Sequence, residues 1–466
     1  MTTLALPRLV VAALRGGSGK TTLTLGLIQA LKNRGLSVKP FKKGPDYIDP
    51  FWHGEAAGTP CHNLDPFMLG RQQVLASLGH FGGGFDAVVV EGNRGLFDGM
   101  DAAGSQSTAE LAKWLKAPVV LVVDCSMASR TVAAVVLGCQ RFDPELNLAG
   151  VVLNPVANAR QEGIIRRAIE EATGIPVLGA VPRLKLAMPE RHMGLVPPQE
   201  HQQVAASLAL AAGSVAQHVD VEALLRLMNA AAPLPRLDPP QGLFPPQPVA
   251  AGRAVIGVLR DAAFGFYYPE NLEALQNFGA RLVFCSALDD AQLPAGIGAL
   301  YIGGGFPETH AARLADNQSF RQSLLRAAEG GLPIYAECGG LMYLGQNLLV
   351  QGGSFPMAGV FPIDFAMQAR PQGHGYTLCQ VTAPNPFLPV GLEFKAHEFH
   401  YSRPQAREGA SYDFAFQVLR GQGILGQGEG LRRWNVLGTY HHVHALGLPQ
   451  WAPGLVSAAL ARAEGS

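Results

Sequence analysis

A glycine-rich loop set between an apolar run and a helical pattern is the feature that most restricts how this chain can fold. Residues 9–14 read LVVAAL and residues 16–22 read GGSGKTT. A helix is predicted over 21–33, because apolar residues recur there at the spacing of one helix face. Glycines let the backbone curl until several N–H groups point inward, and the following helix adds the positive end of its dipole. The pattern therefore predicts a strand, a phosphate-binding loop and a helix in succession.

The side chains of this loop suit a nucleoside triphosphate. Lys20 can reach the β- and γ-phosphates, and the Thr21 hydroxyl can bind Mg²⁺. The strict form of the pattern has glycine where this chain has Leu14, so the loop is a variant form. Asn154, which ends an apolar run, could read an adenine edge or act as a turn residue before Pro155. The predicted ATP-binding residues are Gly16, Gly17, Ser18, Gly19, Lys20, Thr21, Thr22 and Asn154.

Two acidic segments support a metal–nucleotide site. KKGPDYIDP (42–50) and VVVEGNRGLFDG (89–100) place carboxylates at or just past the ends of apolar runs. Ligands of α/β proteins bind at this edge of a parallel sheet, and hard oxygen donors suit a Mg²⁺ that bridges nucleotide phosphates. Asp98 is predicted to orient a substrate carboxylate. The predicted metal ligands are Thr21, Asp46 and Glu91.

Strand and helix patterns alternate along nearly the whole chain, which predicts parallel sheets covered on both faces. Residues 233–252 interrupt the alternation with PLPRLDPPQGLFPPQPVAAG, and so much proline continues neither a helix nor a central strand. A length of 466 residues also exceeds one ordinary domain. The predicted fold class is therefore α/β, with domains at 1–232 and 253–466 and a Pro-rich linker at 233–252.

Composition excludes several classes of partner. Lys plus Arg and Asp plus Glu both total 36, so no net charge draws the chain to nucleic acid or an anionic membrane. The six cysteines contain no CxxC pair, which argues against a disulfide framework or a zinc site. The N-terminal residues lead into the glycine loop rather than a cleavage site, and the longest apolar stretch is shorter than the roughly 20 residues of a membrane span. We expect a cytoplasmic protein with small-molecule partners, and a homodimer is compatible with the sequence.

The second half contains a candidate nucleophile. LPIYAECGGLMYL (332–344) places Cys338 between a strand pattern and a helical pattern, with glycines after it. A thiol at a helix N-terminus is expected to have a lowered pKa and to favour the thiolate. Upstream, YIGGGFPE (301–308) offers flexible backbone N–H groups. The predicted oxyanion-hole residues are Gly304, Gly305 and Gly339.

Histidines near the C-terminus can serve as the base for this thiol. The segment LGTYHHVHALG (437–447) contains His441, His442 and His444. Alternation along a strand places His442 and His444 on one face and His441 on the other. Spacing alone does not choose between His442 and His444. An ATP site followed by a Cys–His hydrolytic pair is the layout of a glutamine-dependent amide ligase.

Motifs in both halves resemble, in order and along nearly the whole chain, the cobyrinic acid / hydrogenobyrinic acid a,c-diamide synthase family. The phosphate loop is similar to the variant loop of the ParA/MinD and dethiobiotin-synthetase group, with Arg15 where some members carry a second lysine. The segments that carry the family resemblance are GPDYIDP (44–50), VVVEGNRGLFDG (89–100), MPERHMGLV (188–196), AFGFYYPENLEAL (263–275), YIGGGFPE (301–308), AECGGLMYL (336–344) and HEFHYS (397–402).

The resemblance implies a dethiobiotin-synthetase-like ATPase domain followed by a class I glutamine amidotransferase domain. It implies that Mg²⁺-ATP phosphorylates the a and c acetate carboxylates of a cobyrinate-type macrocycle, and that ammonia from glutamine captures each acyl phosphate. The resemblance implies that Cys338 attacks glutamine. It also implies that His442 moves the thiol proton, because TYHHVH matches the family's Tyr-x-His-x-His ending. Ordinary triad enzymes carry an acid where this chain has His444. The substrate-carboxylate candidates are Asp98, Ile48 and Arg191.

Rival functions remain at this stage. Cobyric acid synthase shares both domains and amidates other carboxylates, and a nickel-sirohydrochlorin a,c-diamide synthase uses the same chemistry on another macrocycle. A ParA/MinD-type ATPase switch accounts for the phosphate loop but leaves Cys338 and the histidines without a purpose. The chain also departs from the family at Arg15, Gly16, Asn93 and Arg94, where small, hydroxyl or hydrophobic residues are frequent.

Overall fold

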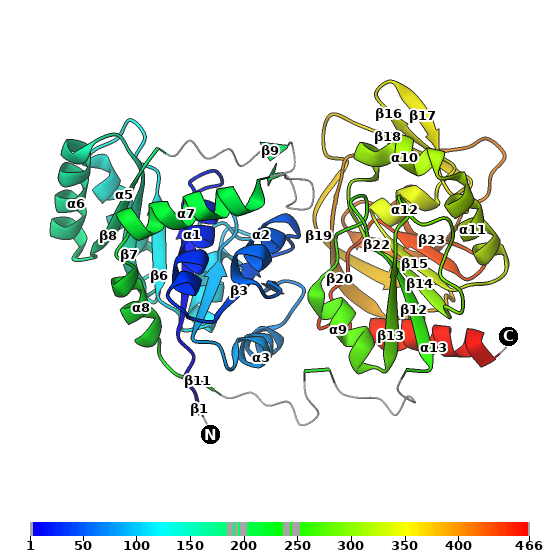
Figure 1. Ribbon diagram of the computed structural model, residues 1–466, viewed down its shortest axis with the longest axis horizontal. Helices are drawn as coiled ribbons and strands as arrows, with labels where there is room; N and C mark the ends of the chain where they lie inside the picture. The colour runs from blue at the N-terminus through cyan, green and yellow to red at the C-terminus, as the bar shows by residue number, and fades with distance from the viewer. Residues whose placement is uncertain are drawn as a thin grey trace. The chain divides into compact units, whose positions relative to one another are not determined.

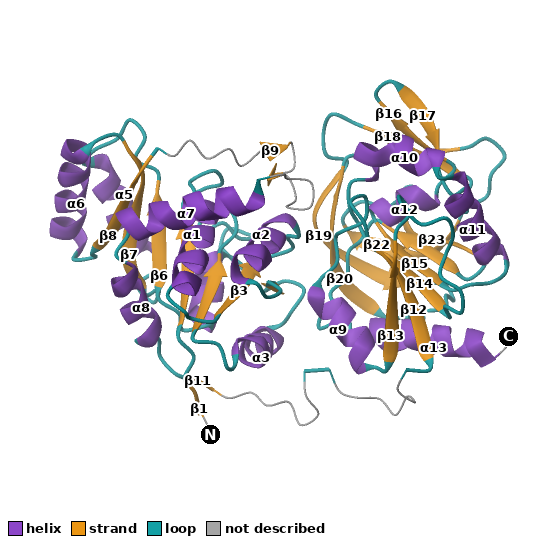
Figure 2. Ribbon diagram, in the orientation of Figure 1, coloured by secondary structure: helices purple, strands orange, loops and turns teal. Residues whose placement is uncertain are grey.

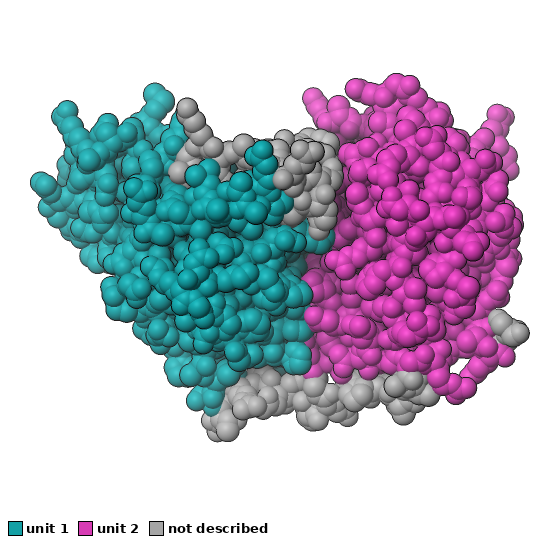
Figure 3. All heavy atoms as spheres, viewed as in Figure 1, with its two compact units in different colours: residues 1–239 teal, residues 240–466 magenta. Residues whose placement is uncertain are grey.

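The computed structural model divides the chain into two compact units, residues 1–239 and 240–466, shown in separate colours in Figure 3. The division falls inside the predicted linker, most of which lies outside the described residues. Its start is described, because β11 (Leu234–Pro235) pairs antiparallel with β1 (Thr3–Leu4) of the first unit. The structure describes residues 3–183, 203–235, 243–244 and 252–464, and the backbone alone at 190–191 and 194–195.

The first unit is built on a seven-stranded parallel sheet in the order β4-β3-β5-β2-β6-β7-β8. Its central strands are apolar on both faces, as expected where helices cover a parallel sheet on both sides. Within this sheet β2 comes first in the chain, and later strands are added on both sides of it, so the loop after β2 lies at a topological switch point. The strands are β2 (Arg8–Ala13), β3 (Val38–Lys43), β4 (His62–Leu64), β5 (Ala87–Glu91), β6 (Val119–Val123), β7 (Leu148–Val156) and β8 (Val177–Pro182).

Helices surround this sheet (Figures 1 and 2). The helices α1 and α7 pack against each other at short range. Gly26 permits the approach, since a Cβ atom there would lie 2.5 Å from the Ala211 carbonyl oxygen. The helices are α1 (Lys20–Asn33), α2 (Ile48–Ala57), α3 (Arg71–Gly82), α4 (Thr108–Trp114), α5 (Thr131–Phe142), α6 (Ala159–Thr173), α7 (Val204–His218) and α8 (Val221–Asn229).

The second unit contains a nine-stranded mixed sheet in the order β13-β12-β14-β15-β24-β23-β22-β19-β20. The five strands from β13 to β24 are parallel, and the four that follow are antiparallel. The strands are β12 (Ala254–Leu259), β13 (Ala280–Cys285), β14 (Ala299–Ile302), β15 (Ile334–Glu337), β19 (Gly373–Val381), β20 (Glu393–His400), β22 (Asp413–Arg420), β23 (Gly428–Arg433) and β24 (Val436–Thr439).

A smaller four-stranded sheet, in the order β17-β16-β18-β21, completes the β structure of this unit. Its strands are β16 (Asn347–Val350), β17 (Gly353–Pro356), β18 (Ile363–Met367) and β21 (Ser402–Ala406). The helices are α9 (Pro269–Asn277), α10 (Ala311–Asp316), α11 (Gln318–Glu329), α12 (Gly339–Leu344) and α13 (Trp451–Glu464).

The predicted α/β fold class is confirmed. Four antiparallel strands of the nine-stranded sheet have no counterpart among the predictions, since they include charged and polar residues that hide the apolar pattern: β19, β20, β22 and β23. Among the residues that the structure describes, no helix combines the length and apolar character needed to cross a bilayer.

Candidate active site

The topology of the first unit brings the predicted phosphate and metal residues to one edge of its sheet. Strand β5 is flanked by β3 and β2, so Glu91 at the end of β5, Lys42 near the end of β3 and the loop after β2 become neighbours. Parallel strands end at the same edge, and the loops there meet in space. The predicted ATP residues from Gly16 to Thr22 occupy that loop and the first turn of α1.

The phosphate loop depends on two glycines in left-handed conformations. Gly17 has φ +72° and Gly19 has φ +87°, which other residues rarely adopt. Lys20 donates to the Arg15 carbonyl at 3.1 Å, so its ammonium already lies over the loop. The Asn154 side chain also supports the loop, because its Nδ2 donates to the Ser18 carbonyl at 2.9 Å.

Glu91 is the centre of a buried polar cluster. Its Oε1 accepts from the Thr21 hydroxyl at 2.9 Å and lies 2.7 Å from Lys42 Nζ, while its Oε2 lies 2.7 Å from His53 Nε2. Burial alone would raise the pKa of Glu91, but the charges of Lys42 and His53 hold it well below the usual value. Glu91 is therefore an ionised carboxylate inside the protein. Lys42 and His53 were missed by the sequence analysis, since neither matches a spacing rule.

Asp46 and Asp49 also contact the Lys42 ammonium. Lys42 Nζ is 3.8 Å from the Asp46 carboxylate and 2.5 Å from that of Asp49. Burial and the nearby charge of Asp49 raise the pKa of Asp46 to about 7. The oxygens of Thr21 and Glu91 fit a hard cation such as Mg²⁺. Asp46 shares the Lys42 ammonium with Glu91, at 3.8 and 2.7 Å, and is a neighbour of this cluster.

The substrate-carboxylate candidates lie in different surroundings. Asp98 is exposed, and its Oδ2 accepts from the Gly95 amide at 2.9 Å. Ile48 is the buried first residue of α2. The Arg191 side chain lies outside the described part of the chain, as does most of the segment 188–196.

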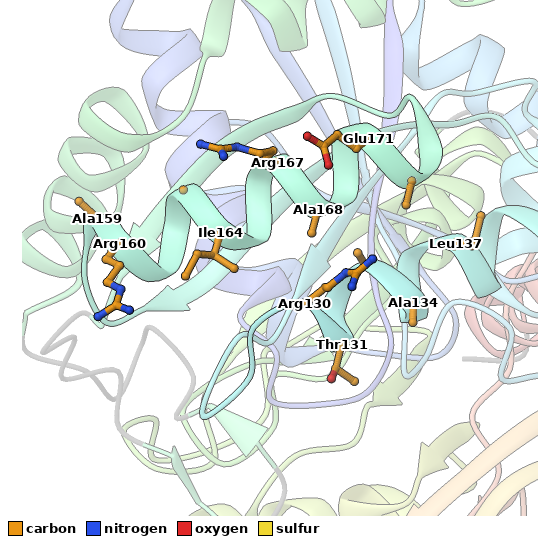
Figure 4. Close-up of a pocket in the computed structure, with 13 residues that line it drawn as sticks. Arg130, Thr131, Ala134, Leu137, Ala159, Arg160, Ile164, Arg167, Ala168 and Glu171 are labelled. Carbon is orange, nitrogen blue, oxygen red and sulfur yellow. The ribbon is translucent and has the colours of Figure 1, made fainter.

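A cavity of about 930 Å³ lies between α5 and α6 (Figure 4). Arg130, Arg160 and Arg167 contribute to its lining, together with alanine and leucine side chains. Among the residues that the structure describes, its lining includes none of those predicted to bind ATP. The phosphate site and this cavity are therefore separate features of the first unit.

The second unit uses the same sheet-edge principle for the predicted thiol. Strand β15 is flanked by β14 and β24, so the segments that follow the three strands meet at one edge. These are the glycine loop after β14, the turn holding Cys338 after β15, and the histidine segment after β24. The topology therefore joins three motifs that are far apart in the sequence.

Cys338 sits in a strained turn between β15 and α12. Its φ is +46°, and its amide donates to the Thr439 carbonyl at 2.7 Å. The side chain is 5% exposed, and the sulfur lies 3.9 Å from the Phe399 carbonyl oxygen. The expected lowering of the thiol pKa is wrong: burial raises the pKa of Cys338, and the nearby charge of Glu308 adds to the effect. The Cys338 thiol is therefore protonated at neutral pH and would need a base in order to act as a nucleophile.

The predicted oxyanion-hole glycines lie against this turn. A Cβ atom on Gly339 would come within 3.0 Å of the Gly305 amide nitrogen. A Cβ atom on Gly305 would lie 2.0 Å from the Ala263 carbonyl oxygen, so only glycine fits there. A Cβ atom on Gly304 would lie 2.5 Å from Cε1 of His442. The glycine loop thus borders both the residue after the thiol and the imidazole.

His442 is held from two sides. Its Nδ1 lies 3.2 Å from a carboxylate oxygen of Glu337, the residue before Cys338. Reciprocal backbone hydrogen bonds of 2.8 and 3.2 Å join it to His397, whose ring stacks on it with the centroids 4.9 Å apart. The motif HEFHYS therefore supports the histidine segment. Among the described residues, no group of three or more His, Cys, Asp and Glu side chains has an arrangement that could hold a metal ion.

The other two histidines have different partners. His444 accepts from the Leu446 amide at Nδ1, and its Nε2 lies 3.5 Å from Glu270. His441 Nδ1 lies 2.9 Å from the sulfur of Cys379, and burial lowers the pKa of His441 to about 4. Both rings use their nitrogens in contacts away from the thiol turn.

Glu429 gives this unit a testable pH dependence. The side chain is fully buried, and burial raises its pKa to about 8. The folded state therefore keeps a proton that the unfolded state loses above about pH 4.5, so the contribution of Glu429 to stability falls as the pH rises from 4.5 to 8. We expect Glu429→Gln to match the parent at pH 5 and to exceed it by roughly 3–5 kcal/mol at pH 8.5. Urea unfolding of the two proteins at both pH values measures the difference in their free energies of unfolding. A difference that is the same at pH 5 and at pH 8.5 contradicts the prediction.

Comparison with known proteins identifies a matching domain family for each unit. Residues 9–196 match the CobQ/CobB/MinD/ParA nucleotide binding domain, and residues 255–449 match the CobB/CobQ-like glutamine amidotransferase domain. A cobyrinate a,c-diamide synthase of Magnetococcus marinus is 46% identical over 97% of this chain and 96% of its own. Proteins of the same name from Archaeoglobus fulgidus (43%; 95% of each chain) and Dehalococcoides mccartyi (40%; 94% of this chain and 95% of its own) are similar over almost the same span. The chain belongs to the cobyrinate a,c-diamide synthase family.

Proposed function

We propose that this protein uses ATP and glutamine to amidate the a and c acetate carboxylates of cobyrinate or hydrogenobyrinate. The observation that carries the proposal is that one chain contains a phosphate loop in contact with a buried carboxylate cluster, and a thiol turn whose preceding residue, Glu337, contacts the His442 imidazole. Relatives that carry the a,c name match both units at 40–46% identity, which does not favour the rival functions. A ParA/MinD-type switch leaves the second unit unexplained.

The first unit activates the substrate in this proposal. The Gly16–Thr22 loop and Lys20 hold the ATP phosphates. Asn154, which donates to the Ser18 carbonyl of the loop, is proposed to contact the adenine base. Thr21, Glu91 and Asp46 would hold a Mg²⁺ ion, which supplies positive charge for phosphoryl transfer when bound. Transfer of the γ-phosphate to a substrate carboxylate breaks the γ-phosphoryl–oxygen bond and leaves ADP. Asp98, Ile48 and Arg191 are the residues proposed to meet that carboxylate.

The second unit releases ammonia. Cys338 attacks the glutamine side-chain amide, and His442 takes the thiol proton and passes it to the departing ammonia. His442 is preferred to His444 because the nitrogens of His444 face Leu446 and Glu270. The amides around Gly304, Gly305 and Gly339 would receive the negative oxygen. Water then cleaves the thioester to glutamate, and ammonia displaces phosphate from the activated carboxylate.

Product masses test the proposal. The purified protein is incubated with Mg²⁺, ATP, glutamine and candidate tetrapyrrole acids, containing cobalt, nickel or no metal. We expect two successive exchanges of a hydroxyl for an amino group on a cobyrinate-type substrate. Amidation of other carboxylates, or ATP hydrolysis at a rate that does not depend on glutamine, would contradict it.

A cytoplasmic location and a homodimer remain predictions.

A further inference from the structure

We propose that Glu337 is the positioning residue for His442, taking the place of the acid that ordinary triad amidotransferases carry two residues after the histidine. The inference deepens the proposed glutamine hydrolysis and rests on it. The acid would come from the position directly before the nucleophile, so one strand end would supply both the thiol and the group that orients its base.

The contacts of Glu337 are those of a carboxylate that accepts several donors. The side chain is 1% exposed. Its Oε2 lies 3.2 Å from His442 Nδ1 and accepts from the Tyr301 hydroxyl at 3.3 Å, and its Oε1 accepts from the Val443 amide at 3.4 Å. Donors from β14 and from the histidine segment therefore converge on the end of β15.

This arrangement selects one tautomer of His442. An ionised carboxylate only accepts hydrogen bonds, so the facing Nδ1 must carry the proton. The lone pair is then on Nε2. This nitrogen lies close to the glycine loop beside the thiol turn, since a Cβ atom on Gly304 would be 3.3 Å from it. Because Cys338 rests as a neutral thiol, a base with its lone pair on that side is needed to remove the proton. Glu337 also stabilises the imidazolium that forms when it does so.

Other groups near His442 are less suited to orient it. His397 stacks on the ring face, and its own Nδ1 lies 3.3 Å from the Tyr268 hydroxyl. His444, which occupies the usual position of the acid, faces Glu270. Glu337 is the acidic side chain that the described contacts place on a nitrogen of His442.

The test compares Glu337→Gln with Glu429→Gln. Both replace a fully buried glutamate of the same unit, but Glu429 accepts from the Gly430 and Tyr440 amides rather than from His442. We expect Glu337→Gln to lower kcat for glutamine hydrolysis by about 10²–10³-fold, with KM for glutamine within about threefold of the parent. Amidation with added ammonium salt should be unchanged. Glu429→Gln should leave both activities near the parent values at pH 7.

Several outcomes would overturn the inference. A kcat for Glu337→Gln within threefold of the parent would do so, as would an equal loss in Glu429→Gln, which would indicate a general packing effect. If Glu337→Gln unfolds at the assay temperature, Glu337→Asp is measured instead. Because Glu337→Asp keeps a carboxylate but places it further from His442, we expect a smaller loss of kcat than in Glu337→Gln, at unchanged KM. A kcat for Glu337→Asp equal to that of the parent would also overturn the inference. Failure of the parent protein to hydrolyse glutamine would count against the proposed function, not against Glu337 alone.

Discussion

Replacement of Cys338 by alanine should abolish glutamine-dependent amidation and leave ammonia-dependent amidation intact. The thiol forms the bond to glutamine, and no other group at the turn supplies a sulfur nucleophile among the described residues. We expect glutamine-dependent kcat to fall by at least about 10⁴-fold, as for loss of other catalytic nucleophiles. Activity with ammonium salt should stay within about threefold of the parent, because the activation chemistry is proposed for the other unit. Product formation is measured with each nitrogen source in parallel.

Cys379→Ala is the matched control for this experiment. Cys379 is another buried cysteine of the same unit, and its sulfur faces His441. We expect this variant to keep glutamine-dependent activity. Retained glutamine use in Cys338→Ala would show that the Cys338 thiol does not release ammonia from glutamine. Loss of activity with both nitrogen sources would mean that the variant damages more than ammonia release.

Lys42→Met should destabilise the first unit strongly. The Lys42 side chain is 2% exposed and its ammonium contacts Asp49, Glu91 and Asp46. Removing it leaves buried carboxylates without their cation, and breaking such a cluster costs about 3–5 kcal/mol. We also expect amidation to fail with either nitrogen source, since the cluster adjoins the phosphate loop. Glutamine hydrolysis by the second unit should persist. Denaturant unfolding and the two activity assays measure these effects.

Lys39→Met is the control that distinguishes the loss of the cation in the carboxylate cluster from the general effect of replacing a buried lysine. Lys39 lies on the same strand and is also buried, but its ammonium donates to the neutral Pro60 carbonyl. Its replacement should cost roughly 1.5–3 kcal/mol, the range for a hydrogen bond made by a charged group. The double variant Lys42→Met with Glu91→Gln should recover part of the stability lost in Lys42→Met, because it removes one uncompensated charge. Equal losses in Lys39→Met and Lys42→Met would contradict the role of the carboxylate cluster.

The sequence predicted the parts of both sites that depend on local patterns. The phosphate loop needs strand, glycines, Lys20 and helix in immediate succession, and the thiol turn needs Cys338 between a strand and glycines. Such features are encoded over a few neighbouring residues. Helix α1 was predicted at 21–33 and is found at Lys20–Asn33, and the strand predicted at 254–259 is β12.

The contacts that set the chemistry lie between distant segments. Lys42, His53 and Glu91 meet only because β3 and β5 are neighbours, and His442 meets Glu337 only because β15 and β24 are neighbours. Strand order of this kind depends on the packing of the whole sheet.

The amino-acid pattern by itself determined the α/β class, the two halves, and the positions of the phosphate loop and the thiol. Only the tertiary structure decided that Cys338 is a buried thiol with a raised pKa, that Glu337 contacts His442, and that Lys42 contacts both Asp46 and Glu91. The physical reason is that conformation near a turn follows from adjacent residues, whereas desolvation and charge pairing depend on every group packed around a site.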